Sequence, residues 1–330
     1  MDAMTNPSVH RAEGEAVSTA SPRDFFDLMK PRVMTLVVFT AFAGLIAAPV
    51  DADPFLAAIS ILCVAVGAGA AGALNMAYDA DIDATMKRTR KRPVPRGAVS
   101  VANAYGFGVV AAILSVLMMA LASNYLAAGL LAFSIFFYAV IYTMILKRST
   151  PQNIVIGGAA GAFPPMIGWV AVTGEVSLDA VILFMIIFLW TPPHSWALAL
   201  YKSGDYAAAG VPMMPVAKGA KSTRLQILLY SLVLVVFAGA PVLTSLGGVI
   251  YAATSLGGGA LFLLLAWRVF NSRAGEAGSA EEGALYAVRA GDKAARDLFA
   301  YSIGYLAVLF AALIVEHAFG AYIGIPGVSA

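Results

Sequence analysis

The sequence is poor in charge and in cysteine. Only 12% of its 330 residues are Asp, Glu, Lys or Arg, about half of the roughly 25% found in soluble globular domains. Hydrophobic residues make up 60% of the chain, and its mean hydropathy is +0.82. These values exclude a protein solvated mainly by water. The single cysteine, Cys63, lies in an apolar run, which excludes a disulfide framework and indicates no thiol site.

Long apolar runs are abundant, and each approaches the roughly 20 residues that cross about 30 Å of hydrocarbon. We therefore expect an all-α, polytopic membrane protein with nine transmembrane helices. The weakest break between runs is Gly247-Gly248. The nine predicted spans cover approximately residues 33–49, 55–75, 101–122, 125–146, 152–173, 178–200, 225–246, 248–269 and 299–321.

The distribution of charge predicts the orientation of these spans. If the amino terminus is cytoplasmic, all 21 Lys and Arg residues fall on the cytoplasmic side, as the positive-inside rule requires. The carboxyl terminus then lies on the outer side, and we expect a bacterial cytoplasmic (inner) membrane. Residues 1–23 are polar and predict a disordered cytoplasmic tail. Residues 24–330 form one expected nine-helix domain.

The stretch from Asn75 to Gly97 combines acids with cations. Asn75, Asp79 and Asp83 stand four residues apart, so each step drifts only about 40° around a helix and the three share one face. Two carboxylates and an amide oxygen suit a hard cation such as Mg²⁺. Asp81 lies about 200° from Asp79 and is expected to face solvent or a neighbouring loop. Six basic residues follow: Lys87, Arg88, Arg90, Lys91, Arg92 and Arg96.

Guanidinium groups grip phosphate oxygens in a bidentate fork, so this stretch predicts a diphosphate site. Each part alone has a simpler explanation. A basic loop commonly anchors a positive-inside segment, and acids at a helix end are often solvated. Their joint occurrence favours a site, because anchoring needs no aligned acids. Ionisable groups at the membrane edge are functional candidates because their burial is costly.

A second polar loop, residues 201–224, should reach the same membrane face. Within the preceding span, Pro192 and Pro193 are expected to break the helix and free carbonyls that need a partner or a water-filled cavity. His194 follows directly and is therefore expected to face a cavity. We also expect both polar loops to close one cavity between two helix bundles.

Three motifs carry a family resemblance. NxxxDxxxD followed by MKRTRKRPVPRG, together with WTPPHSWALAL and GVPMMPV, resembles the UbiA-type intramembrane prenyltransferase superfamily. The resemblance extends over nearly the whole chain from about residue 25. It implies nine helices around a central cavity that opens laterally to lipid and is capped by cytoplasmic loops.

The closer resemblance, in Arg88–Gly97, Trp190–Val216 and Leu298–Phe310, implies an activity. Similar members transfer a farnesyl group from farnesyl diphosphate to a vinyl group of haem B, with water adding as hydroxyl, to give haem O. The implied cofactor is Mg²⁺, a downstream haem A synthase is a suggested partner, and no nucleic acid is expected. A quinone precursor or another aromatic or tetrapyrrole acceptor remains an alternative. A transporter is disfavoured, because its charged groups would lie near the midplane.

The resemblance also implies roles for individual residues. One departure concerns the second acidic motif: the residue four beyond Asp205 is Ala209, so a complete second Mg²⁺ ligand set is not expected. Aromatic side chains near the site are expected to stabilise an allylic cation through their π faces. The implied metal ligands are Asn75, Asp79, Asp83 and Asp205, and the implied diphosphate ligands are Arg88, Lys91, Arg92, Arg96 and Lys202. The implied haem or prenyl contacts are His194, Trp190, Trp196, Tyr78 and Tyr201. The implied catalytic residues are Asn75, Asp79, Asp83, Arg88 and Arg92.

Overall fold

The computed structural model describes residues 20–244, 246–276 and 288–324, and this part of the chain contains helices and no strand. Residues 1–19 of the predicted tail lie outside the described residues, while α1 begins at Pro22, just inside the tail's predicted end. The helices are α1 Pro22–Leu28, α2 Pro31–Ile46, α3 Pro54–Tyr78, α4 Ala80–Thr85, α5 Val101–Ala122, α6 Tyr125–Phe136, η1 Phe137–Leu146, α7 Lys147–Ser149, α8 Asn153–Thr173, α9 Leu178–Tyr201, α10 Ser203–Ala208, α11 Met214–Lys218, α12 Ala220–Phe237, η2 Ala240–Leu243, α13 Val249–Phe270, η3 Ala290–Asp292 and α14 Lys293–Ala318.

The membrane spans match the sequence prediction. Among the described residues, eight helical stretches are long and apolar enough to cross a membrane, and the pair α1 and α2, bent by 56°, makes a ninth. Each predicted span overlaps one of these stretches. The break near Gly247-Gly248 is also confirmed, because α12 ends at Phe237 and α13 begins at Val249. The chain is an all-α, polytopic membrane protein.

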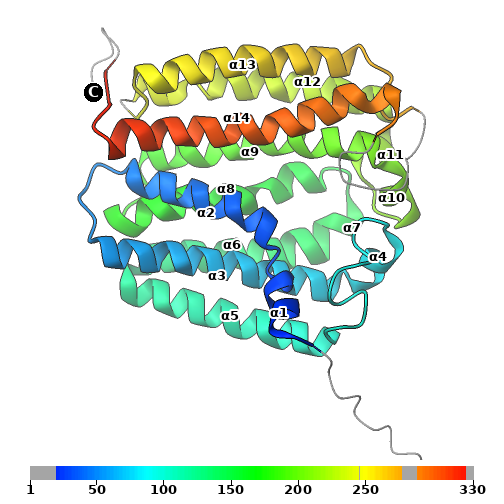
Figure 1. Ribbon diagram of the computed structural model, residues 1–330, viewed down its shortest axis with the longest axis horizontal. Helices are drawn as coiled ribbons and strands as arrows, with labels where there is room; N and C mark the ends of the chain where they lie inside the picture. Colours follow the sequence, from blue (N-terminus) through cyan, green and yellow to red (C-terminus); the bar gives the residue numbers. More distant parts are fainter. Residues whose placement is uncertain (1–19, 245, 277–287, 325–330) are drawn as a thin grey trace, which may run out of the picture.

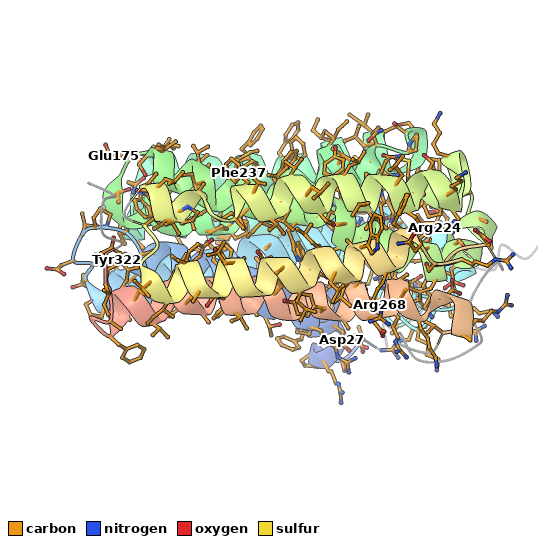
Figure 2. The ribbon with its side chains drawn as sticks, turned by 90° about the horizontal axis from the view of Figure 1, so that it is seen from above. Asp27, Glu175, Arg224, Phe237, Arg268 and Tyr322 are labelled. Carbon is orange, nitrogen blue, oxygen red and sulfur yellow. The ribbon has the colours of Figure 1, made fainter. Side chains whose placement is uncertain are left out.

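The helices lie side by side, with α2 and α8 in the middle of the bundle (Figure 1). One group, α3, α5 and α6, packs on one side of this central pair, and α9, α12, α13 and α14 pack on the other. The short helices α4, α7, α10 and α11 gather at one end. Figure 2 shows Arg224 and Arg268 at that end, and Glu175 and Tyr322 at the opposite end. The two ends therefore differ in charge.

The central pair depends on glycine. A Cβ atom at Gly44 of α2 would lie 2.1 Å from the carbonyl oxygen of Pro165 in α8, and one at Gly168 would lie 2.0 Å from the carbonyl oxygen of Ala41. No side chain fits at either position, so the two backbones touch. Such close approach of small residues is a common way for helices to associate in lipid, where packing replaces the hydrophobic effect.

The expectation that Pro192 and Pro193 break the sixth span is wrong. Helix α9 runs without interruption from Leu178 to Tyr201, and α8 likewise continues through its own Pro164-Pro165 pair. Prolines remove hydrogen bonds but do not force a break when neighbours hold the helix. Here α8, α12 and α14 all pack against α9, and both of its prolines are buried.

A buried acid joins the last two long helices. Glu316 of α14 is fully buried, and its carboxylate oxygens accept hydrogen bonds from the backbone N–H groups of Gly248 (2.8 Å) and Tyr251 (2.9 Å). These groups belong to the first turn of α13, where donors lack helical partners and a negative charge is favourable. The Glu316 carboxylate therefore caps α13 from a different helix.

Glu316→Ala is expected to destabilise the fold, because it leaves two buried N–H groups without acceptors, at about 1–3 kcal/mol each. Thermal unfolding of the detergent-purified protein should show a lower Tm than the wild type. Glu175→Ala removes an exposed acid at the same end of the bundle and should leave Tm unchanged. Equal Tm values for Glu316→Ala and the wild type would contradict the capping role.

Candidate active site

A polar cavity of about 210 Å³ lies at the end of the bundle where the short helices gather. It brings together four residues that the sequence predicts for the site, namely Asn75, Asp83, Arg88 and Arg92. The remaining lining residues are Lys30, Val33, Met86, Tyr138, Tyr142, Lys147, Ile154, Tyr206, Val211 and Met213. One carboxylate, four cations and three tyrosines thus face one space.

Both loops that the sequence predicts to be cytoplasmic contribute to this cavity. Ile82 and Met86 pack with Val211 and Met213 in one buried apolar cluster, so the loop after α4 and the loop after α10 close on each other. Most of the lining comes from the α1–α2 junction, the α3–α4 region, η1 and α8. The cavity therefore lies on the α3 side of the central pair rather than midway between two halves of the bundle.

The acids keep the shared face that their spacing predicts. Helix α3 ends at Tyr78 and α4 begins at Ala80, but the backbone bonds continue from Asp79 N–H to Asn75 O (3.0 Å) and from Asp83 N–H to Asp79 O (2.8 Å). The Asn75 amide donates to Asp79 Oδ2 at 2.7 Å and to Thr143 Oγ1 at 3.0 Å. Asp79 is fully buried and does not itself line the cavity.

Two cations neutralise the buried acids. Lys147 Nζ lies 2.5 Å from Asp79 Oδ2, and an Arg92 guanidinium nitrogen lies 2.6 Å from Asp83 Oδ2. Asp79 is 0% exposed and Asp83 is 2% exposed. Carboxylates buried this deeply need cationic partners. This compensation explains how the acids are held at a membrane edge.

The same acids fit a metal ion. Asp79 Oδ1 is buried without a hydrogen bond, and an Arg148 guanidinium nitrogen lies 3.5 Å from it. Within the described residues, no group of three His, Cys, Asp or Glu side chains could hold a metal. Asn75 Oδ1, the third oxygen that the sequence predicts for the metal, accepts a hydrogen bond from the Lys30 amine. Oxygen ligands of this kind suit Mg²⁺, and metal binding by these three side chains stays a prediction.

Sequence reasoning missed Lys30 as a site residue. Lys30 joins α1 to α2, and it is the only residue other than glycine with positive φ among the described residues (φ 55°, ψ 56°). Its amine donates to Asn75 Oδ1 at 2.5 Å and lies 5.9 Å from the centre of the Tyr138 ring. The only sequence signal was a lysine placed directly before the proline that opens a span.

The segment η1 is a π-helix, which the sequence does not predict. Its i→i+5 bonding brings residues four or five apart onto one face. Tyr138, Tyr142 and Lys147 consequently face the cavity together. Gly157 makes room for this face, because a Cβ there would lie 2.2 Å from the Tyr142 ring. π-Helical segments frequently occur at functional sites.

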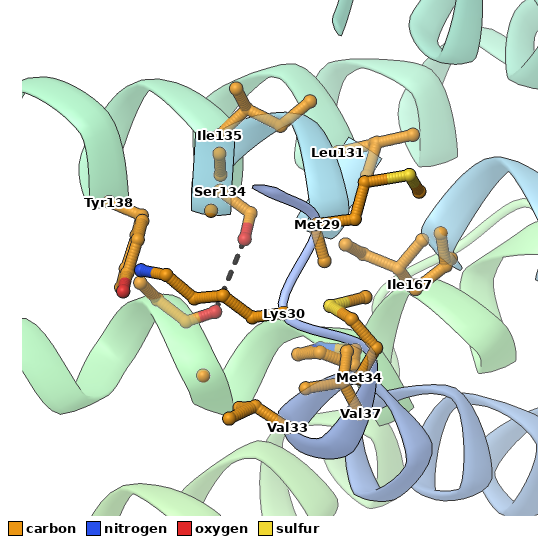
Figure 3. A pocket seen from close by; sticks show the side chains of 17 residues that line it. Met29, Lys30, Val33, Met34, Val37, Leu131, Ser134, Ile135, Tyr138 and Ile167 are labelled. Carbon is orange, nitrogen blue, oxygen red and sulfur yellow. Dashed lines mark hydrogen bonds between the residues drawn. The ribbon is translucent and has the colours of Figure 1, made fainter. Parts of the chain in front are cut away.

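An apolar cavity of about 140 Å³ lies next to the polar one, and Figure 3 shows the side chains that line it. The two cavities share Lys30, Val33 and Tyr138. Beyond these residues, the one polar side chain on the apolar wall is Ser134, whose hydroxyl donates to the carbonyl of Ala160 at 3.2 Å. A molecule with an anionic head and an apolar tail would fit the two cavities together.

The loop after α9 brings further predicted residues near the polar cavity. Burial lowers the pKa of the Lys202 amine; the Asp205 carboxylate opposes this shift, and the charge of Arg88 reinforces it. Asp205 is half-buried on α10, and Tyr206 rather than Asp205 lines the cavity. The predicted role of Asp205 as a metal ligand therefore stays a prediction.

Three of the predicted haem or prenyl contacts, Trp190, His194 and Tyr201, form a separate cluster with Phe299 of α14, whereas the Trp196 ring packs against Tyr230 of α12. The His194 ring is stacked between the rings of Trp190 (4.1 Å) and Phe299 (4.7 Å). His194 Nδ1 and Ser302 Oγ form a hydrogen bond of 2.7 Å, and Ser302 Oγ also lies 2.7 Å from the Phe299 carbonyl oxygen. His194 and Trp190, with Trp196 and Tyr201 of the same helix, line neither cavity.

Other predicted residues lie at the rim. Arg148 stacks over the Tyr78 ring at 5.0 Å and pairs with Asp81 at 2.7 Å; Asp81 is exposed, as its helical position predicts. Arg96 forms an ion pair with Asp24 of α1 and so ties the basic loop to that helix. Lys91 is exposed. None of these side chains lines the polar cavity.

Comparison with known proteins places the chain in a family. A model of the UbiA prenyltransferase family matches residues 36–282. The chain belongs to the UbiA prenyltransferase family. Among its relatives in this family, protoheme IX farnesyltransferase from Maricaulis maris is 91% identical over 329 residues, which cover 100% of both chains. Protoheme IX farnesyltransferase from Caulobacter vibrioides is 60% identical over 309 residues, or 92% of this chain and 93% of that protein.

Solved structures share the UbiA fold. A digeranylgeranylglyceryl phosphate synthase aligns with a TM-score of 0.70 and 18% identity over 89% of this chain and 97% of that chain. A UbiA homologue from Archaeoglobus fulgidus bound to GPP and Mg²⁺ aligns with a TM-score of 0.60 and 18% identity over 88% of this chain and 99% of that one. This UbiA-family chain therefore has the architecture of intramembrane prenyltransferases.

Proposed function

We propose that this protein transfers a farnesyl group from farnesyl diphosphate to a vinyl group of haem B, giving haem O and diphosphate. The observation that carries the proposal is that an acid- and cation-lined cavity and an apolar one lie side by side and share Lys30, Val33 and Tyr138 as lining residues. The relatives at 91% and 60% identity, both named protoheme IX farnesyltransferase, support this choice of donor and acceptor.

The polar cavity would hold the diphosphate. Asn75, Asp79 and Asp83 would bind Mg²⁺, which neutralises the charge that develops on a leaving diphosphate. Arg92 and Lys147 now pair with those acids, and a diphosphate with its metal would compete for these same cations. Arg88 and Lys30 would add positive charge from the cavity wall. Lys91, Arg96 and Lys202 would contribute to the potential at the rim.

The reaction must keep its cation from water until it meets the acceptor. Breaking the allylic C–O bond leaves the electron pair on diphosphate and a cation on the farnesyl chain. Attack by the terminal vinyl carbon moves the positive charge to the carbon beside the porphyrin ring. Water then adds to that carbon and loses a proton, which completes the hydroxyl group. An apolar chamber favours this order, because it excludes bulk solvent from the first step.

Tyr138 is the aromatic residue best placed for the cationic step, since it lines both cavities. The face of an aromatic ring attracts a nearby cation by about 0.5–2 kcal/mol. Tyr138→Leu should therefore lower kcat by roughly tenfold, whereas Tyr138→Phe, which keeps the ring, should stay within about threefold of the wild type. Equal kcat values for the Leu and Phe variants in the farnesyl-transfer assay would remove this role.

Haem B, the acceptor of the farnesyl group, would bind beside the cluster of aromatic residues around His194. We propose that His194 and Trp190, together with Trp196 and Tyr201, contribute to haem binding, and that Tyr78 contributes at the rim. The hydrogen bond between His194 Nδ1 and Ser302 Oγ supports this role, because it fixes the ring and leaves Nε2 as the free ring nitrogen. Haem O would then pass to a haem A synthase.

The proposed orientation places the active site at the cytoplasmic face of a bacterial inner membrane. The amino terminus would be cytoplasmic and the carboxyl terminus would lie on the outer side. The charge difference between the two ends of the bundle (Figure 2) supports this topology, because Lys and Arg favour the cytoplasmic side. Asp205 is proposed as an additional acid near the metal.

The deciding experiment incubates the purified protein with haem B, farnesyl diphosphate and Mg²⁺, followed by mass analysis of the haem. Haem O formation that depends on all three components supports the proposal. Prenylation of a quinone precursor instead, with haem B unchanged, would reassign the acceptor. Absence of any diphosphate release would overturn the enzymatic proposal and favour a transporter.

A further inference from the structure

The apolar cavity has a definite depth along the helix axes. Its lining extends from Gly72 to Val64 on α3, eight residues or about 12 Å at the helical rise, and from Ala160 to Ile167 on α8, about 10 Å. Figure 3 shows Tyr138 and the Lys30 amine at one end, and Leu131 and Ile167 at the other. The cavity therefore leads away from the polar site into the bundle.

The far end of the cavity is closed by branched aliphatic side chains. Val64, Leu131 and Ile167 line it and are only 1%, 2% and 1% exposed, respectively. All three belong to the main hydrophobic core. A protein core is packed as densely as an organic crystal, so a longer ligand would have to displace these side chains.

Small residues keep the cavity wide along the part nearest the polar site. Ala68, Ala71 and Gly72 line it from α3, and Ala160 and Gly161 line it from α8. A Cβ atom added at Gly161 would meet no other atom within 4 Å. The space beside Gly161 is thus open, whereas the end beyond it is filled.

We propose that Val64, Leu131 and Ile167 set the longest prenyl chain that the enzyme accepts, and that the open space at Gly161 admits the part of that chain nearest the diphosphate. This inference rests on the proposed prenyl transfer and adds its chain-length selectivity. A longer chain clashes with the closed end. A shorter chain leaves apolar space unfilled and binds less tightly.

The first test enlarges the closed end. Ile167→Ala should raise the ratio of kcat/KM for geranylgeranyl diphosphate (C20) over farnesyl diphosphate (C15) by roughly tenfold or more, with haem B as acceptor. Ile186→Ala is the matched control, because Ile186 of α9 is also 1% exposed and does not line the cavity. If Ile167→Ala does not fold, Ile167→Val should shift the ratio in the same direction by a smaller factor.

The second test fills the part of the cavity beside Gly161. Gly161→Leu should lower kcat/KM for farnesyl diphosphate and for geranyl diphosphate (C10) alike, by roughly tenfold or more, because both chains must pass this residue. Gly129→Leu is its control, since a Cβ at Gly129 of α6 also meets nothing within 4 Å, and this residue does not line the cavity. The control should keep the wild-type kcat/KM for both donors.

A raised C20 over C15 ratio in Ile167→Ala and a loss of both shorter donors in Gly161→Leu, with both controls unchanged, support the inference. An unchanged C20 over C15 ratio in Ile167→Ala, or equal effects in the controls, overturns it. If the wild-type enzyme transfers no prenyl chain of any length to haem B, the proposed function itself is wrong. The failures of the two proposals are therefore distinguishable.

Discussion

Asp79→Ala and Asp83→Ala are expected to lower farnesyl transfer by roughly 10²- to 10³-fold, the usual effect of losing one charge-stabilising group from an active site. Asp79 and Asp83 supply two of the three oxygen-bearing side chains that suit Mg²⁺, and Asp79 Oδ1 is buried without a hydrogen bond. Removing either acid weakens the site that neutralises the leaving diphosphate.

Folding must be separated from chemistry in this experiment. Asp79→Ala leaves the Lys147 amine without its 2.5 Å partner, which can itself destabilise the protein. Asp79→Asn keeps the side-chain volume and provides the second variant. Both variants are assayed for haem O formation over a range of Mg²⁺ concentrations, alongside Tm measurements.

Asp81→Ala is the matched control. Asp81 lies on α4, as Asp83 does, but it is exposed and pairs with Arg148 at the surface. Exposed ion pairs contribute little, so this variant should retain nearly wild-type activity. Comparable activity in the Asp81, Asp79 and Asp83 variants would remove the metal assignment.

Lys30→Met is expected to reduce kcat by roughly 10²-fold. The Lys30 amine donates to Asn75 Oδ1 and lies where the polar and apolar cavities meet, so it is placed beside the bond between diphosphate and prenyl chain. Methionine keeps the length of the side chain and removes its charge. The measurement is single-turnover farnesyl transfer, with diphosphate affinity measured separately by competition.

Lys218→Met serves as the control for Lys30→Met. Lys218 is an exposed cation of α11 at the same end of the bundle and lines neither cavity. Its loss should change the single-turnover rate less than twofold, the range expected for a weak surface charge. A Lys30→Met rate within threefold of the wild type would exclude Lys30 from the chemistry.

The spans were predictable because lipid imposes a simple length requirement. An apolar run of about 20 residues has few alternatives in a membrane, and eight stretches plus the bent α1–α2 pair match the nine predicted spans. The acid cluster was predictable for a similar reason. Four-residue spacing keeps Asn75, Asp79 and Asp83 on one face even though the helix is interrupted at Asp79.

The remaining features depend on contacts distant in sequence. Lys30 enters the site because a left-handed residue joins α1 to α2, and no local pattern encodes which way that junction turns. Tyr138 and Tyr142 face the cavity because η1 is a π-helix, which depends on packing against α3 and α8. Pro192 and Pro193 did not break α9, because three neighbouring helices hold it in place.

The two joined cavities would treat the prenyl donor as a bivalent ligand. While the donor is intact, its head and its tail each hold the other at a high effective concentration in the adjoining cavity. Lys30, Val33 and Tyr138 stand at the junction where the covalent link between them would lie. Cleavage of that link turns one bivalent ligand into two monovalent ones, so the chemical step itself would weaken the enzyme's hold on diphosphate and help to release it.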